Sequence, residues 1–142
     1  MIKNWLIPCN VKYFDICEHF RHQNKVIWKN ISYVNKGDLV YIYLGYPHKE
    51  IRYKCKVVDD HVADEIVSLN EYARTRHPKS KMYQIEEKYM ELELIQELPV
   101  GSLTLDQLRV NGLGQVQVQA PIKNDLREFI EKNVSIWQNE KH

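Results

Sequence analysis

Cysteine is scarce in this sequence, and long apolar runs are missing. The three cysteines include no C-x-x-C pair, which argues against a disulfide framework and against a four-cysteine zinc site. No apolar run approaches the ~20 residues that cross a bilayer, and the segment before Pro8 lacks the apolar core of a signal peptide. We therefore expect a cytoplasmic protein with reduced thiols and no membrane partner.

An excess of charge is also missing. Twenty basic and nineteen acidic residues leave a net charge of +1. A chain that holds nucleic acid by bulk charge would be strongly basic. Any nucleic acid must therefore be bound by a local site, with a weak contribution from the overall field.

Familiar catalytic motifs are absent as well. The sequence has no G-x-S-x-G, P-loop, dinucleotide fingerprint or H-E-x-x-H motif. Gly112-Leu-Gly114 is typical of a helix stop, and His19 and His22 are typical of a solvated helix end. We expect a protein that is not an enzyme and that uses no cofactor and no metal.

What the sequence does contain is a set of short segments that predict strands. Residues 39–44 are rich in β-branched and aromatic residues and largely apolar on both faces, and residues 51–57 alternate cleanly from Ile51 to Val57. The connection between these two segments predicts a hairpin. Its second strand turns Arg52, Lys54 and Lys56 towards water. Further strands are predicted at 4–8, 89–95 and 115–119.

Amphipathic spacing and capping residues predict three helices. These helices are expected at 13–22, from Thr104 to Gly112, and from Pro121 to about Gln138.

The remaining segments are less regular. Residues 24–35 show a mixed pattern, and residues 59–88 predict a polar, partly mobile insert, with a helical turn over 64–73 and a basic run over 74–81. The order of all these elements predicts one α+β domain over residues 1–142, built on a curved sheet or open barrel.

Three features of the sequence suit a ligand site, and each has a structural alternative. Trp28 lies in a polar segment between lysines, where it is either a platform on which a base stacks or part of the core. Asn10 follows the first strand and either makes a local turn or reads a base edge. The basic stripe of the hairpin is either a solvated face or a contact for phosphates.

The ordered set of these segments resembles the EVE domain, a member of the PUA-like superfamily that also includes the YTH and ASCH domains. The resemblance rests on Asn4-Trp-Leu-Ile-Pro-Cys-Asn10, on Ile27-Trp-Lys-Asn30 and on Lys36-Gly-Asp-Leu-Val-Tyr-Ile-Tyr43. It implies a PUA-like curved β-barrel with flanking helices. It also implies a pocket for a flipped or modified base.

The resemblance also implies roles for individual residues. Trp28 would stack on the base, Asn10 would read its polar edge, Tyr43 would line the same pocket and Asn30 would assist. The nucleic-acid backbone would be contacted by Lys29, Arg52, Lys54 and Lys56.

The implied partner is nucleic acid, with modified DNA favoured and RNA as the alternative. EVE-like domains in bacteria resemble readers of restriction–modification systems, so a separate nuclease is a further expected partner. A second alternative is a small-molecule-binding or hydrolytic ASCH-like protein, for which Lys29 is the only local side chain that suits the chemistry.

Overall fold

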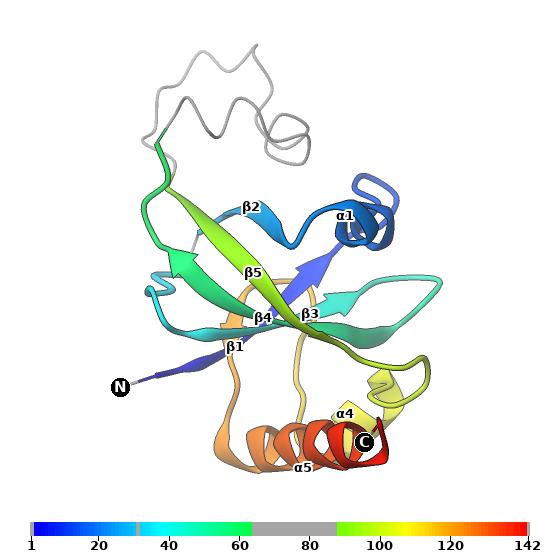
Figure 1. Cartoon of the computed structure of the whole chain (residues 1–142). Coiled ribbons are helices and arrows are strands. Elements are labelled where there is room, and N and C mark those ends of the chain that lie inside the picture. Colours follow the sequence, from blue (N-terminus) through cyan, green and yellow to red (C-terminus); the bar gives the residue numbers. More distant parts are fainter. Residues whose placement is uncertain (1, 31, 64–87, 142) are drawn as a thin grey trace.

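The centre of the molecule is a strongly curved mixed sheet of six strands in the order β2-β5-β4-β3-β1-β6 (Figure 1). The computed structural model describes residues 2–30, 32–63 and 88–141. β1 and β3 pair in parallel, and all other neighbours are antiparallel. The strands are β1 (Asn4–Cys9), β2 (Lys25–Lys29), β3 (Leu39–Leu44), β4 (Glu50–Asp59), β5 (Tyr89–Glu97) and β6 (Ala120–Pro121).

The sheet curls without closing into a barrel. β2 and β6 are its two edge strands, and no ladder joins them in the described part of the chain. Side chains connect the edges instead: Gln119 Nε2 donates to the Lys29 carbonyl at 2.6 Å, and Ser32 Oγ donates to the Gln119 carbonyl at 3.3 Å. The predicted α+β class with a curved sheet is confirmed, and the β-barrel that the resemblance implies is corrected to an open, curved sheet.

The strands β3, β4 and β5 form a continuous antiparallel meander, of which the sequence predicts the hairpin between β3 and β4. The expected clean alternation of residues 51–57 is wrong at its start, because Ile42 pairs with Tyr53 whereas Tyr43 pairs with Ile51. This bulge leaves Arg52 as the extra residue. Tyr53 therefore faces the interior of the curve, and Ile51 faces the opposite side.

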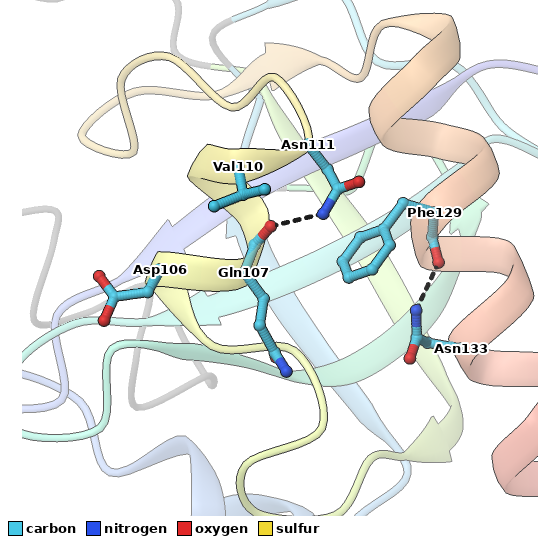
Figure 2. Close-up of a pocket in the computed structure, with 6 residues that line it drawn as sticks. All are labelled: Asp106, Gln107, Val110, Asn111, Phe129 and Asn133. Atoms are coloured by element: carbon cyan, nitrogen blue, oxygen red, sulfur yellow. Dashed lines mark hydrogen bonds between the residues drawn. The ribbon is translucent and has the colours of Figure 1, made fainter.

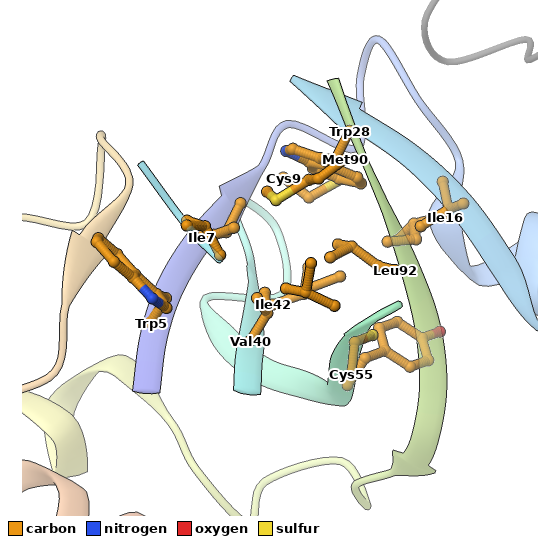
Figure 3. Close-up of a cluster of buried hydrophobic side chains, with 14 of the residues drawn as sticks. Trp5, Ile7, Cys9, Ile16, Trp28, Val40, Ile42, Cys55, Met90 and Leu92 are labelled. Atoms are coloured by element: carbon orange, nitrogen blue, oxygen red, sulfur yellow. The ribbon is translucent and has the colours of Figure 1, made fainter. Parts of the chain in front are cut away.

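The concave face of the sheet encloses the larger apolar core (Figure 3). Phe14 and Ile16, from the segment after β1, pack into one end of it. Each fully buried aliphatic side chain here contributes about 1.5–3 kcal/mol to stability. The strand residues of this core are Trp5, Ile7, Cys9, Val26, Trp28, Val40, Ile42, Leu44, Tyr53, Cys55, Val57, Met90 and Leu92.

The opposite face of β1 and β3 is covered by two helices, α4 (Leu105–Val110) and α5 (Asn124–Lys141) (Figure 1). Leu6 and Tyr41 of the sheet pack there against Leu126 and Ile130 of α5. Thr104 caps α4 as predicted, and it does so in a capping box, since Thr104 and Gln107 exchange side chain to backbone hydrogen bonds. No helix in the described residues is long and apolar enough to span a bilayer.

A buried aspartate fixes the entry to β3. The Asp38 carboxylate accepts hydrogen bonds from the Trp5 indole Nε1 at 2.9 Å, from the Lys3 backbone N–H at 3.0 Å and from the Asn35 backbone N–H at 3.0 Å. Gly37, with φ of 94°, takes the left-handed conformation that the turn before it requires. The Lys36-Gly37-Asp38 signal thus joins the start of β3 to β1.

Several predicted boundaries are wrong. The first helix, α1 (Ile16–His22), starts three residues later than predicted, because Asp15 caps it by accepting the Glu18 N–H at 3.1 Å. The mixed segment 24–35 contains β2. Residues 115–119 form no strand, and Pro121 belongs to β6 rather than to a helix. The predicted helical turn at 64–73 and the basic run at 74–81 lie outside the described residues.

Candidate functional site

The two aromatic residues of the predicted base pocket lie on opposite faces of the sheet. Trp28 is 2% exposed and packs in the concave core beside Met90, its register partner, with the Phe14 ring edge-on at 6.0 Å (Figure 3). Tyr43 is buried in the other core, together with Leu103 and Leu108. Because successive strand residues alternate between faces, these two side chains do not line one pocket, contrary to the expectation.

The two predicted asparagines bond to their own loops. Asn10 Oδ1 accepts the Lys12 N–H at 3.1 Å, which is the local turn that competed with a base-reading role. Asn30 Nδ2 donates to the Val34 carbonyl at 2.7 Å, and Asn30 Oδ1 accepts the Val34 N–H at 3.0 Å. Asn10 is exposed at the end of β1, whereas the Asn30 amide is engaged at both of its ends.

The predicted cations do not form a free basic stripe. Arg52 donates through Nε to the Leu98 carbonyl at 3.0 Å and pairs with the Glu97 carboxylate at 3.2 Å. Lys56 pairs in register with Glu93, which also lies opposite Lys25 of β2. Acidic neighbours therefore weaken the positive potential that phosphates require. Lys29 is half-buried at the end of β2, and contacts of Lys29, Lys54 and Lys56 with nucleic acid stay predictions.

A shallow cleft of about 310 Å³ lies between α4 and α5 (Figure 2). Asn111 and Asn133 stand on either side of the Phe129 ring, and each donates its amide to a carbonyl of its own helix, at 2.7 and 2.8 Å. Among the described residues, Asp106 is the only ionisable one that lines the cleft. With a negative charge and no cation among these lining residues, the cleft does not suit a phosphate ligand.

A different set of residues gathers where β1 and β3 end. The two strands are parallel, and their last residues, Cys9 and Leu44, are register partners. Loops 10–15 and 45–49 therefore leave the sheet side by side, where these two strands end (Figure 1). The Gly45 N–H donates to the Cys9 carbonyl at 3.1 Å and ties the loops together. We call these two loops the tyrosine edge, after the exposed tyrosine in each.

Each tyrosine of this edge carries a lysine over its ring. Tyr13 is 58% exposed with Lys12 Nζ 5.8 Å from its ring centroid, and Tyr46 is 80% exposed with Lys49 Nζ at 5.8 Å. Exposed aromatic rings stack on bases, and neighbouring ammonium groups pair with phosphates. Asn10 lies in the same edge and presents a side-chain amide to solvent. The edge therefore combines three chemical groups that suit an unpaired nucleotide.

The backbone of the 45–49 turn is held from both sides. The N–H groups of His48 and Lys49 donate to the Gly45 carbonyl at 3.0 and 3.4 Å, and the Lys49 carbonyl accepts the Leu105 N–H at 2.9 Å. Lys49 has φ of 52°, a left-handed conformation that costs free energy in a residue other than glycine. The turn thus presents Tyr46 and Lys49 from a fixed backbone.

The sequence contained a signal for this edge that single-residue reasoning missed. Tyr13 and Tyr46 each lie within a polar loop, and each has a lysine within three residues along the chain. The helix predicted over 13–22 assigned Tyr13 to a buried face. The connection predicted after Leu44 was treated only as a link between strands.

The buried ionisable groups of the sheet suit a structural role. Burial raises the pKa of the Cys55 thiol and of the Tyr53 phenol, so neither is an activated nucleophile at neutral pH. Burial, with a smaller effect of the Glu131 charge, raises the pKa of Tyr41 to about 12. The Tyr41 hydroxyl lies under α5 and has no hydrogen-bond partner in the described part of the chain.

Replacing Tyr41 with phenylalanine tests whether the buried Tyr41 hydroxyl lacks a hydrogen-bond partner. An unfolded phenol has a pKa of about 10. The folded protein therefore retains a proton that the unfolded chain loses, and stability should fall as the pH rises from about 10 to about 12. We expect Tyr41→Phe to make this fall shallower and to leave stability at pH 7 equal or higher, because no hydrogen bond is lost. Urea denaturation between pH 7 and 12 checks both. A marked loss of stability at pH 7 would mean that the hydroxyl has a partner.

Known proteins that resemble this chain are found among solved structures. Neither the protein-family models nor the curated proteins give a match. Among solved structures, a hypothetical protein from Leishmania major has a TM-score of 0.68 at 16% identity, with 97% of this chain and 98% of that chain covered.

Two other similar structures have informative names. Human THYN1, in complex with 5-methylcytosine-containing DNA, has a TM-score of 0.62 at 12% identity over 92% of this chain and 96% of that chain. A ZmASCH mutant protein from Zymomonas mobilis has a TM-score of 0.61 at 15% identity over 92% and 95%. The chain therefore has the fold of the PUA-like and ASCH proteins, as the resemblance predicts, and the narrower EVE assignment stays a prediction.

Proposed function

We propose that this protein is a non-catalytic nucleic-acid-binding module that holds an unpaired or flipped base, with modified DNA as the favoured ligand, at the tyrosine edge. The observation that carries the proposal is the pair of exposed tyrosines, each with a lysine over its ring, on two loops at one edge of the sheet. A similar fold in human THYN1 has been solved with 5-methylcytosine-containing DNA, which supports DNA as the first ligand to test.

Replacing Tyr46 with alanine should weaken binding to single-stranded oligonucleotides about tenfold, because base–aromatic stacking contributes ~1–3 kcal/mol. Tyr46→Phe retains the ring and should bind like the wild type. Val110→Ala is the matched control, since Val110 is an exposed apolar residue of the α4–α5 cleft. Fluorescence anisotropy with cytosine, 5-methylcytosine, 5-hydroxymethylcytosine and N6-methyladenine oligonucleotides measures the affinities and identifies the preferred base.

The salt dependence of binding gives a second readout in the same experiment. Two lysines at the edge predict a slope of log affinity against log salt of about −1.5 for a single strand. Matched RNA oligonucleotides test the alternative of an RNA-binding module through a preference for the 2′-OH. The proposal fails if Tyr13→Ala and Tyr46→Ala both bind every oligonucleotide as the wild type does. A separate nuclease partner, a restriction–modification setting and a cytoplasmic location stay predictions.

A further inference from the structure

Tyr33 is an aromatic residue held in a strained conformation at the surface. Its φ of 59° lies in the left-handed region, which bulky residues rarely adopt, and its side chain is 80% exposed. A strained backbone costs free energy, and an exposed ring gains no burial in return. The hydrogen bonds of the loop hold this conformation and leave the ring accessible to a ligand that stacks on it.

The loop that carries Tyr33 is fixed by hydrogen bonds on both sides of that residue. The Asn30 amide holds both the N–H and the carbonyl of Val34, and the Asn30 N–H donates to the Lys88 carbonyl at 2.8 Å. Ser32 Oγ donates to the carbonyl of Gln119, which directly precedes β6, the edge strand on the other side of the sheet. Asn30, predicted from the sequence to assist base reading, thus positions Tyr33.

Tyr33 repeats the arrangement of the tyrosine edge at the opposite end of the sheet. Lys88 Nζ lies 5.7 Å from the Tyr33 ring centroid, close to the distances at Tyr13 and Tyr46. The loop follows β2 and leads to the start of β3, whereas Tyr46 follows the end of β3. At ~3.3 Å per residue, the six residues of β3 separate the two ends by about 20 Å.

We propose that Tyr33, with Lys88, is a second stacking position for the same ligand, so that the protein binds a single strand of about six or more nucleotides that reaches from the tyrosine edge to this loop. Stacked nucleotides advance ~3.4 Å each along a strand, so about six of them span 20 Å. This inference rests on the proposed function and adds the length and strandedness of the ligand to it.

The experiment compares oligonucleotides of about 4 and about 12 nucleotides. Both lengths lie within the range of site sizes of single-strand-binding domains, about 4–16 nucleotides. Anisotropy titrations would use the wild type, Tyr33→Ala, Tyr33→Phe, Tyr33→Gly and Tyr46→Ala. We expect Tyr33→Ala to weaken the longer oligonucleotide about tenfold and to leave the shorter one unchanged. Tyr33→Phe should bind like the wild type, and Tyr46→Ala should weaken both.

Tyr33→Gly separates binding from folding. Glycine adopts positive φ without strain, so this variant should have a thermal unfolding midpoint at or above that of the wild type. It should still bind the longer oligonucleotide more weakly than the wild type does. If Tyr33→Ala and Tyr33→Gly bind the longer oligonucleotide normally while Tyr46→Ala is weakened, the second position is wrong and the proposed function stands. If no variant changes binding, both fail. If Tyr33→Ala weakened binding of the shorter and the longer oligonucleotide equally, the two-position arrangement would also be wrong.

Discussion

Replacing Trp28 with alanine should lower the free energy of unfolding by about 3–5 kcal/mol, the usual cost of truncating a buried tryptophan. The indole is buried between Met90 and Phe14, so its removal leaves a cavity in the concave core. Urea denaturation followed by circular dichroism measures the effect. Any loss of ligand binding in Trp28→Ala must therefore be read together with its stability.

Trp28→Phe is the matched control for this prediction. Phenylalanine retains an aromatic ring beside Phe14 and leaves a smaller cavity, so we expect a loss of about 1–2 kcal/mol. The opposite pattern would be informative. If Trp28→Ala kept the stability of the wild type but no longer bound modified oligonucleotides, the indole would be the base platform that the family resemblance implies, and the tyrosine edge would be secondary.

Replacing Asp38 with alanine should destabilise the protein by about 3 kcal/mol. The change leaves the Trp5 indole N–H buried without an acceptor and removes the acceptor from the backbone N–H groups of Lys3 and Asn35. Each unsatisfied buried donor costs ~1–3 kcal/mol. The midpoint of urea denaturation reports the loss.

Asn35→Ala provides the control for Asp38→Ala. Asn35 contacts the aspartate through its backbone: its N–H donates to the carboxylate and its carbonyl accepts the Asp38 N–H at 3.0 Å. The substitution therefore preserves all three hydrogen bonds of the carboxylate and should change stability by less than about 0.5 kcal/mol. Asp38→Asn retains an acceptor oxygen and should lie between the two. Equal stability of Asp38→Ala and Asn35→Ala would show that β1 is held to β3 by the strand ladder and the core alone.

The parts of the fold that the sequence predicts best are those specified by local patterns. The turn at Gly37 and the apolar run after it identify β3, and Thr104 identifies the start of α4. The bulge at Arg52 is different, because register depends on both partner strands and no local pattern encodes it. β2 was missed for a similar reason: its five residues become a strand by pairing with β5.

The candidate site shows the same division. The sequence predicts correctly that Asn10 lies at the end of a strand. It does not show that Tyr46, far along the chain, leaves the sheet beside it, because this neighbourhood arises from the parallel pairing of β1 with β3. The burial of Trp28 likewise depends on Phe14 from another loop. The sequence therefore indicates aromatic residues that suit a site, whereas the tertiary structure decides which of their rings are exposed.

The pairing of β1 also has a consequence for how the chain acquires its structure during synthesis. β1 leaves the ribosome first, but its neighbours are β3 and the much later β6, with Trp5 opposite Pro121. The meander β3-β4-β5 needs no β1 to form its own ladders, whereas β1 has one edge open at Trp5 and Leu6 until β6 has been made. Such a strand is exposed to association with other nascent chains. The ladder that closes this edge of β1 is therefore the last one in the sheet that synthesis allows to form.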